Sequence, residues 1–294
     1  MTPRTVAIIG AGRVGSAMGF LLNKAGYTIT AVVNRSLESA EKASAFIGTG
    51  EPTTDLAAAS KAGIILIATP DRAIREVCEK IAAGGLRAGS IVIHTSGAHT
   101  LDLLSAAEVR AAHRAVLHPL QSLASREQGI KTLPGSYFRI EADPAALASA
   151  KEIVKALGGV ELVMPKWTQD NDSAALYHAG AVAVSNYFVT LVDYGLKFYQ
   201  ALGADKKEAL SAVLPLIRGT LSNIETLGIP DALTGPIMRG DIETVRGHLT
   251  AMRKRTPELA GLYKELARQT VSVAQEKGSI TLDTAGELLK VVKE

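Results

Sequence analysis

The first half of the chain alternates short apolar runs with amphipathic stretches, and this pattern predicts strands alternating with helices. Continuous apolar runs bounded by glycine, proline or polar residues are typical of strands that are buried on both faces of a parallel sheet. The strands predicted in this way comprise residues 6–9, 27–33, 63–68, 90–95, 115–117, 137–141 and 160–164. Helices are predicted over residues 14–25, 37–46 and 53–60, and a further helix begins near Asp71. Because strands joined by helices form right-handed βαβ units, we expect an α/β fold with a doubly wound, mostly parallel sheet.

The pattern changes near Pro165, after which no stretch resembles a strand. Apolar residues then recur at helical spacing, which predicts helices over residues 168–201, 206–227, 241–254, 257–276 and 282–292. A chain of 294 residues is long enough for two domains with separate cores. The sequence therefore predicts an α/β domain over residues 1–165 and an all-α domain over residues 166–294.

One segment of the helical half, residues 173–192, contains no Asp, Glu, Lys or Arg. It does contain His178, Ser185 and Asn186, and charged residues flank it closely. We interpret it as a buried helix of a water-soluble protein rather than as a membrane span.

A glycine-rich turn follows the first predicted strand and opens the first helix. The turn reads Gly10-Ala11-Gly12-Arg13-Val14-Gly15. In this context the first glycine permits a tight turn, the second lets a pyrophosphate approach the bare backbone, and the third lets the helix pack closely on the strand. The free N–H groups at the helix start favour phosphate binding. The turn therefore predicts a Rossmann dinucleotide-binding site.

The end of the second strand indicates which dinucleotide binds. A chain that binds NAD usually has an acidic residue at this point, which holds the ribose 2′-hydroxyl. Here the residues are Asn34, Arg35 and Ser36. A cation and a hydroxyl suit a 2′-phosphate, and no carboxylate is present to repel it. We therefore predict NADP(H) as the cofactor.

Charge and cysteine content exclude several classes of function. The chain has 32 Lys and Arg against 29 Asp and Glu, without a basic block beyond Arg253-Lys254-Arg255, which we interpret as a solvated helix face. Nucleic acid is therefore not an expected partner. The single cysteine, Cys78, excludes an internal disulfide and lies on an apolar helix face, where we expect it to fill the core. With no signal-peptide pattern at its start, the chain is expected to be cytoplasmic. The histidines lack metal-ligand spacing, so no metal is predicted.

Polar residues follow three predicted strands at the point where each strand ends. They are Thr69-Pro70, Thr95-Ser96 and His118. Ligands of doubly wound sheets lie across the carboxyl ends of the strands, so these residues can line the nicotinamide and a substrate. His118 is a candidate proton donor for the alkoxide that forms when a carbonyl accepts hydride. The alternative is a structural histidine at a turn.

The helical half supplies further candidates. His178, Ser185 and Asn186 lie in an otherwise apolar and uncharged helix, where they either line a pocket or form a buried network. Arg239 lies in a loop rich in turn-forming residues and can hold a substrate carboxylate. The alternative is that Arg239 pairs with Asp241, which would then cap the next helix.

These motifs together resemble those of a known family. The segments that carry the resemblance are residues 10–15, 33–36, 68–71, 94–98, 117–120, 176–179 and 232–241. The chain resembles the bacterial family that joins a Rossmann-like NADP oxidoreductase-like domain to a C-terminal helical domain of unknown function, within the 6-phosphogluconate dehydrogenase-like superfamily. Some members are similar to an alternative ketopantoate reductase. In ketopantoate and hydroxyisobutyrate relatives a helix lysine precedes an asparagine by four residues, whereas here Val182 precedes Asn186.

The leading hypothesis is an NADPH-dependent reductase of a small 2-oxo acid such as ketopantoate. His118 or His178 would supply the proton, Ser96 and Asn186 would orient the carbonyl, and Ser185 and Arg239 would contact the substrate. A second hypothesis is oxidation of a cyclic hydroxy acid, because Ser96 and His118 resemble the prephenate dehydrogenase arrangement. A third is a non-catalytic NADP(H) sensor. The apolar helical half also predicts a homodimer.

Overall fold

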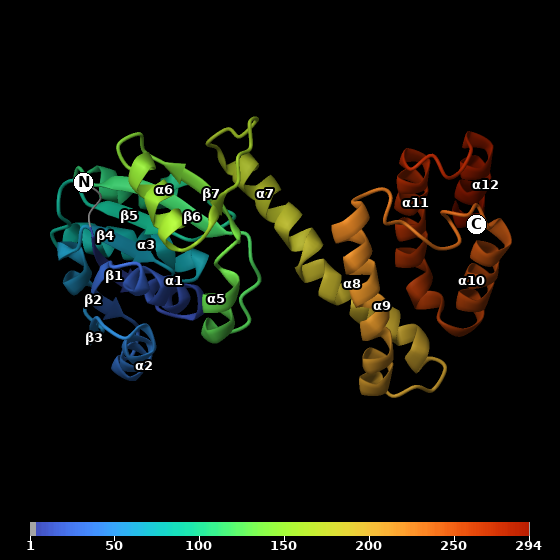
Figure 1. Ribbon diagram of the computed structural model, residues 1–294, viewed down its shortest axis with the longest axis horizontal. Coiled ribbons are helices and arrows are strands. Elements are labelled where there is room, and N and C mark those ends of the chain that lie inside the picture. The colour runs from blue at the N-terminus through green and yellow to red at the C-terminus, as the bar shows by residue number, and fades with distance from the viewer. Residues whose placement is uncertain (1–3, 294) are drawn as a thin grey trace. The chain divides into compact units, whose positions relative to one another are not determined.

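A computed structural model describes residues 4–293 of the chain, and its contacts divide it into two compact units (Figure 1). The first unit ends at Ser185 and the second begins at Asn186. The predicted domain boundary between residues 165 and 166 lies after β8, the last strand of the first unit. Whether an independently folding domain ends there stays a prediction.

The first unit is built on one eight-stranded sheet with the order β3-β2-β1-β4-β5-β6-β7-β8. The strands are β1 (Thr5–Ile9), β2 (Thr28–Val33), β3 (Glu51–Thr53), β4 (Ile64–Ile67), β5 (Ile91–His94), β6 (His113–Pro119), β7 (Tyr137–Ala142) and β8 (Val160–Glu161). Strands β1 to β6 are parallel, β7 is antiparallel to β6, and β8 is parallel to β7. The doubly wound, mostly parallel sheet that the sequence predicts is confirmed.

Helices cover both faces of this sheet, which explains why its central strands are apolar at every position (Figure 1). The α-helices of the unit are α1 (Arg13–Lys24), α2 (Leu37–Ile47), α3 (Asp71–Ala83), α4 (Ser105–Glu108), α5 (Arg126–Thr132), α6 (Leu147–Ala156) and α7 (Asn171–Val184). Alternate side chains of β1 enter different cores: Val6 and Ile8 pack in the core that α1, α2 and α6 also line. Ala7 and Ile9 pack in the core that α3 and α4 line, where Cys78 fills space as expected.

The strand register brings the carboxyl ends of the central strands together. Ile9 of β1 pairs with Ile67 of β4, Ile67 pairs with His94 of β5, and His94 pairs with Val116 of β6. The residues that follow these positions therefore lie along one edge of the sheet. His118 lies two residues beyond Val116 on β6, so it belongs to the same edge as the glycine turn after β1.

Two glycines of this turn are required by close packing. Gly10 has φ of 81°, and a Cβ atom there would lie 2.8 Å from the backbone nitrogen of Thr69. A Cβ atom on Gly15 would lie 2.7 Å from the carbonyl oxygen of Gly10. A Cβ atom on Gly12 would have no neighbour closer than 4.0 Å, so this glycine leaves space above the start of α1.

The helix predicted over residues 53–60 is confirmed only in part, as a 3₁₀ helix that begins three residues later. Residues 51–53 form the edge strand β3, and a 3₁₀ helix, η1, covers Leu56–Lys61 after the Asp55 cap. The charged and proline-containing sequence of β3 hides it from a hydrophobicity pattern, because an edge strand tolerates proline and needs only one partner. Strand β8 is also shorter than predicted. A second 3₁₀ helix, η2, spans Leu101–Leu104.

The second unit is entirely helical in the residues that the structure describes. Its helices are α8 (Asn186–Gln200), α9 (Lys206–Leu227), α10 (Ile242–Arg255), α11 (Ala260–Glu276) and α12 (Leu282–Lys293), with the 3₁₀ helix η3 (Pro257–Leu259) before α11. Helices α10, α11 and α12 share a core that contains Val245, Val271 and Leu288. The all-α C-terminal region is confirmed. The single helix predicted over residues 168–201 is instead interrupted at Ser185, between α7 and α8.

The uncharged segment is not the buried helix that the sequence predicts. The helical segment Asn171–Gln200 is long and apolar enough to cross a membrane by length and composition, and none of its most apolar window is buried in the chain. Leu176, Val184 and Val189 are 77%, 78% and 70% exposed. The sequence of this segment shows that the helix is apolar, but it does not show whether other parts of the chain cover the helix or leave it exposed.

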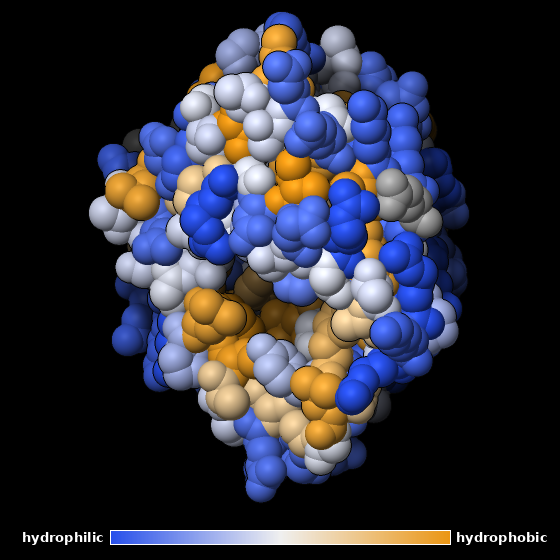
Figure 2. All heavy atoms as spheres, turned by 90° about the vertical axis from the view of Figure 1, so that its right-hand side faces the viewer, coloured by the Kyte–Doolittle hydropathy of each residue, from blue (hydrophilic) through white to orange (hydrophobic). Residues whose placement is uncertain are grey.

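Helices α8 and α9 also line an apolar hollow of about 290 Å³. Its walls include Phe188, Leu191, Val213 and Ile217, with Thr220 among the few polar residues. Figure 2 shows apolar side chains around a hollow in the lower half of the face formed by the second unit. The second unit therefore contains a three-helix part with its own core and a hairpin of α8 and α9 that lines an apolar hollow.

Candidate functional site

The glycine turn is fixed to the end of β2 by Asn34. The Asn34 side-chain oxygen accepts a hydrogen bond from the backbone nitrogen of Ala11 at 2.8 Å, and its nitrogen donates to the carbonyl oxygen of Ser39 at 2.9 Å. Ser36 caps α2 by accepting from the Ser39 backbone nitrogen at 3.4 Å. Asn34 and Ser36 therefore build the turn and the helix start, while the exposed Arg35 lies between them.

The start of α1 keeps its backbone donors accessible. Gly12 is the N-cap residue and has no side chain to cap the helix, and Arg13 and Gly12 are exposed while Val14 is half-buried. The first turn of α1 contains no acidic residue. The N–H groups of a helix start that lacks a side-chain cap are available to an anion.

Thr69 contributes a polar atom without a partner beside the glycine turn. Its hydroxyl oxygen is buried and makes no hydrogen bond among the described residues. Pro70 is the N-cap residue of α3, and Thr95 is half-buried after β5. The structure thus places the predicted cofactor-binding residues at the ends of β1, β2, β4 and β5.

The two candidate histidines meet over Gly97. The ring centroids of His118 and His178 are 6.1 Å apart in an edge-on arrangement. A Cβ atom on residue 97 would lie 2.7 Å from Nε2 of His118 and 2.8 Å from Nδ1 of His178. Glycine is therefore the residue that lets both rings approach. The His178 Nδ1 atom is buried and makes no hydrogen bond within residues 4–293.

A tyrosine that the sequence analysis did not single out completes this cluster. The Tyr177 hydroxyl lies 2.9 Å from Nδ1 of His118, and the two rings are edge-on at 5.5 Å. Burial raises the pKa of Tyr177 to about 12. Tyr177 is therefore protonated near neutral pH. The sequence analysis chose the adjacent His178 as a candidate. It could not choose Tyr177, because the contact of Tyr177 with His118 joins residues that are far apart in the sequence.

His118 is neutral in this environment. Burial lowers the pKa of His118 to about 3, with further lowering by the nearby charge of Arg139 and by His178 and His94. The imidazolium that a histidine proton donor requires is therefore not populated near neutral pH. What His118 can offer is a neutral imidazole N–H.

A buried ion pair that the sequence analysis missed lies beneath the cluster. Arg139 and Glu141 both have side chains that are 1% exposed, with an Nη1 to Oε2 distance of 3.4 Å. Arg139 is the cross-strand partner of His118 in the β6–β7 register. Its Cζ atom lies 4.9 Å from the ring centre of Trp167 and 5.6 Å from that of Tyr177.

Arg139 also holds the loop after β5. Its Nη2 atom donates to the carbonyl oxygens of Ser96 at 3.3 Å and His99 at 2.5 Å. The Ser96 hydroxyl accepts from the backbone nitrogen of Ala98 at 3.3 Å, which leaves its proton free to be donated. One buried cation therefore fixes both the loop that carries Gly97 and the aromatic side of the cluster.

His94 is a structural residue of this loop. Its Nε2 atom lies 2.9 Å from the carbonyl oxygen of Thr100, and its Nδ1 accepts from the backbone nitrogen of Ser96 at 3.1 Å. Because a carbonyl can only accept, Nε2 carries the proton and His94 is neutral. Burial lowers the pKa of His94 to about 4.

Three further predicted residues come from the end of α7 and from the second unit. Ser185 ends α7, and Asn186 and Arg239 belong to the second unit, where both are exposed. Asp241 caps α10 by accepting from the backbone nitrogen of Thr244 at 3.1 Å. Hydrogen bonds from the Thr244 side chain and backbone lower the pKa of Asp241, and the charge of Arg239 adds to this effect. The roles proposed for Ser185, Asn186 and Arg239 stay predictions.

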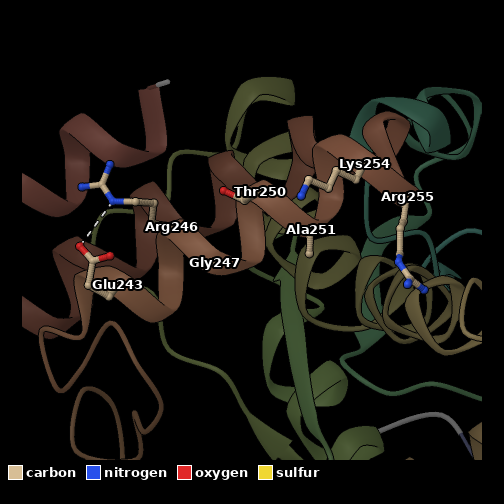
Figure 3. Close-up of a pocket in the computed structure, with 7 residues that line it drawn as sticks. All are labelled: Glu243, Arg246, Gly247, Thr250, Ala251, Lys254 and Arg255. Atoms are coloured by element: carbon tan, nitrogen blue, oxygen red, sulfur yellow. Dashed lines mark ion pairs between the residues drawn. The ribbon is translucent and has the colours of Figure 1, made fainter.

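A shallow groove on the second unit comes from α10 alone. It has a volume of about 410 Å³ and follows one face of the helix, from Glu243 to Arg255 (Figure 3). Glu243 pairs with Arg246 at 3.5 Å. Residues 253–255 are exposed, as expected of a solvated helix face. Because all the residues that line the groove come from one helix, they do not surround a ligand.

Among residues 4–293 no group of three acidic, histidine or cysteine side chains is arranged to hold a metal ion.

Two family models match the chain. Residues 2–119 match a Rossmann-like domain, and residues 136–270 match a domain of unknown function, DUF2520. The family resemblance that the motifs predict is thereby confirmed. No curated protein matches the sequence.

Solved structures share the fold across most of the chain. An NADP oxidoreductase candidate from Bacteroides fragilis is 24% identical, with a TM-score of 0.71 and coverage of 92% of this chain and 99% of that one. A Thermotoga maritima protein is 24% identical, with a TM-score of 0.72 and coverage of 92% and 99%. A reductive aminase from Aspergillus terreus, solved with NADPH and ethyl-5-oxohexanoate, is 17% identical, with a TM-score of 0.58 and coverage of 100% and 93%.

The buried histidines predict a specific acid sensitivity. The pKa values of His118 and His94 are depressed in the folded state, so the unfolded chain binds more protons below about pH 6.5. Stability should be fully present above that pH and should be lost as the pH falls toward the folded-state values. His118→Asn should reduce the loss between about pH 7 and about pH 5 by roughly 1–2 kcal/mol, measured by urea unfolding. His113→Asn, at the other end of β6, is the control; an equal pH slope in the wild type and His118→Asn would contradict the prediction.

Proposed function

We propose that this chain, which joins a Rossmann-like domain to a DUF2520 domain, is an NADP(H)-dependent oxidoreductase that reduces the carbonyl group of a small 2-oxo acid. Ketopantoate is the first candidate substrate. The observation that carries the proposal is the position of the His118 cluster on the same sheet edge as the glycine turn, fixed by the register from β1 to β6. The pairing of a phosphate-binding turn with a buried N–H donor on that edge suits hydride transfer to a carbonyl.

The residues of the turn fit the proposed cofactor. The open space at Gly12 and the uncapped start of α1 suit a pyrophosphate. The exposed Arg35 suits a 2′-phosphate, and the unpartnered hydroxyl of Thr69 offers a hydrogen bond at the end of β4. When bound, NADPH supplies the hydride. The reductive aminase with this fold was solved with NADPH, which supports the choice of cofactor class.

The chain's own residues would act on the carbonyl oxygen. We assign Tyr177 as the donor to Nδ1 of His118, an assignment that places the His118 proton on Nε2. This N–H would polarise the carbonyl and stabilise the negative charge that develops on its oxygen. The free hydroxyl proton of Ser96 would give a second hydrogen bond. His118 thus replaces the lysine of the ketopantoate relatives as a neutral donor, and His178 encloses the site.

The function is tested by NADPH oxidation over a panel of 2-oxo acids that includes ketopantoate. We expect turnover with at least one acid, and His118→Asn should lower it by about 10²-fold or more. His113→Asn should leave it unchanged. Binding of NADPH without oxidation by any carbonyl compound would favour the sensor hypothesis instead. Reduction of NADP by a cyclic hydroxy acid would favour the prephenate-dehydrogenase-like alternative, which the Ser96 and His118 pair allows.

Cofactor preference depends on Arg35. Replacing it with serine removes the charge proposed to face the 2′-phosphate, so the NADPH dissociation constant should rise by about tenfold while NADH affinity stays the same. Fluorescence titration of both cofactors measures this. Arg75→Ser, an exposed arginine on α3, is the matched control. Equal loss of NADH and NADPH affinity in Arg35→Ser would contradict the assignment.

We also propose that the chain forms a homodimer through α7, α8 and α9, since these helices leave large apolar side chains exposed. Val189 and Leu216 are 70% and 68% exposed. The double variant Val189→Lys and Leu216→Lys should be monomeric by light scattering, while Glu287→Lys on α12 should stay dimeric. A wild-type chain that stays monomeric at all concentrations, or that binds lipid vesicles through this face, would contradict the homodimer. A cytoplasmic location stays a prediction.

A further inference from the structure

The hydrogen bond between Tyr177 and His118 joins the phenol oxygen to Nδ1 over 2.9 Å. Among the described residues that face the His118 ring are Arg139 from β7, His94 from β5, and His178 and Tyr177 from α7. None of them is a carboxylate that would stabilise an imidazolium, and Glu141 is engaged by Arg139. The ring is therefore neutral, and with Tyr177 as the donor to Nδ1 its proton lies on Nε2, the atom beside Gly97. A proton path through the imidazole would then join the phenol oxygen to the proposed substrate oxygen.

A neutral imidazole cannot release its Nε2 proton unless its other nitrogen gains one. The Tyr177 hydroxyl, 2.9 Å from Nδ1, is the proton donor placed to do this. The cost is a phenolate in a half-buried position. That cost depends on the charge near the ring.

Arg139 supplies a fixed positive charge at the Tyr177 ring. Its Cζ atom lies 5.6 Å from the ring centre, and its side chain is 1% exposed. The bonds to Glu141, Ser96 and His99 prevent it from moving away. A fixed cation in a site of low dielectric constant stabilises an anion that forms beside it without reorganisation. The Nε atom of Arg139 makes no hydrogen bond within residues 4–293, so part of its donor capacity is unused.

We propose that Tyr177 is the proton source of the reaction, that His118 relays the proton, and that Arg139 is the positioning counter-charge. The inference rests on the proposed function. After hydride reaches the carbonyl carbon, the substrate alkoxide takes the proton from Nε2 of His118, and the electron pair of that N–H bond stays on the ring. In the same event Nδ1 takes the Tyr177 proton, so the imidazole remains neutral and the tyrosine becomes a phenolate beside Arg139. A hydronium ion from solvent then protonates Nε2, and Nδ1 returns its proton to the Tyr177 oxygen, which restores the starting tautomer and completes the balance.

The first test is Tyr177→Phe, which keeps the ring and removes the proton. Turnover of the substrate found in the panel should fall by about 10²-fold, while the NADPH dissociation constant should not change. In mixtures of H₂O and D₂O, the wild-type rate should depend on deuterium content in a curved way, because two protons move, and the variant should give a straight line. Tyr194→Phe is the matched control, since Tyr194 is a buried tyrosine whose hydroxyl donates to the Leu259 carbonyl oxygen at 2.7 Å.

A second readout does not depend on turnover. Nitrogen-15 NMR of the histidine rings should show His118 as the Nε2–H tautomer in the wild type, and a shift toward a mixture of tautomers in Tyr177→Phe. The ultraviolet difference between the wild type and Tyr177→Phe isolates the ionisation of this one tyrosine. It should move to higher pH in Arg139→Gln and return in Arg139→Lys. Arg114→Met is the control, since Arg114 lies near the start of β6 and pairs with Asp143 just after β7.

The relay is overturned if Tyr177→Phe keeps the wild-type rate, or if His118 is the Nδ1–H tautomer in the wild type. An unchanged ionisation of Tyr177 in Arg139→Gln overturns the role of Arg139. These outcomes differ from failure of the proposed function, in which the wild-type chain itself oxidises no NADPH while the tautomer of His118 still has the expected form.

Discussion

The Arg139–Glu141 ion pair is the interaction on which the site of the first unit depends. Removing two charges from water costs several kcal/mol for each ion, and their mutual attraction offsets this only when further hydrogen bonds complete the geometry. Arg139 has such bonds to Ser96 and His99, and Glu141 accepts from the Leu101 backbone nitrogen at 3.4 Å. The pair therefore joins strand β7 to the loop after β5. That loop carries Gly97, against which His118 and His178 pack. The packing around the two histidines therefore depends on a buried charge as well as on the loop sequence.

The same pair determines the electrostatics around His118. A buried cation one strand away disfavours a second positive charge on the imidazole, and burial acts in the same direction. Arg139 also lies near the rings of Trp167 and Tyr177. The aromatic faces partly satisfy a guanidinium whose Nε has no other partner. Arg139 thus adds to the effect of burial in keeping His118 neutral, and it also contacts the aromatic rings and holds the adjacent loop.

The sequence predicts the fold and the glycine turn well because both depend on local patterns. Buried parallel strands are continuous in apolar residues, and the spacing of Gly10, Gly12 and Gly15 follows from the geometry of one strand-to-helix turn. The roles of Arg139 and Tyr177 depend on contacts between distant segments, so no local spacing identifies them. Arg139 sits in an ordinary strand pattern, and its partner His118 is found only through the antiparallel register of β6 and β7. The interruption between α7 and α8 at Ser185 could likewise not be predicted, because the residues around it are all compatible with a helix.

The charge of the cluster also constrains the substrate. His118 is neutral and Tyr177 is protonated. The cation of the cluster, Arg139, is 1% exposed and binds Glu141 and two backbone carbonyl oxygens. Such a site can donate hydrogen bonds to an uncharged carbonyl oxygen, but it offers no accessible cation to a carboxylate. A carboxylate placed against Tyr177 would also oppose the phenolate on which the relay depends. If the substrate is a 2-oxo acid, its carboxylate must therefore be recognised by groups outside this cluster, and the ketone end alone must face His118. Because the carboxylate of a 2-oxo acid is bonded to the carbonyl carbon, the groups that bind it must lie immediately beside His118.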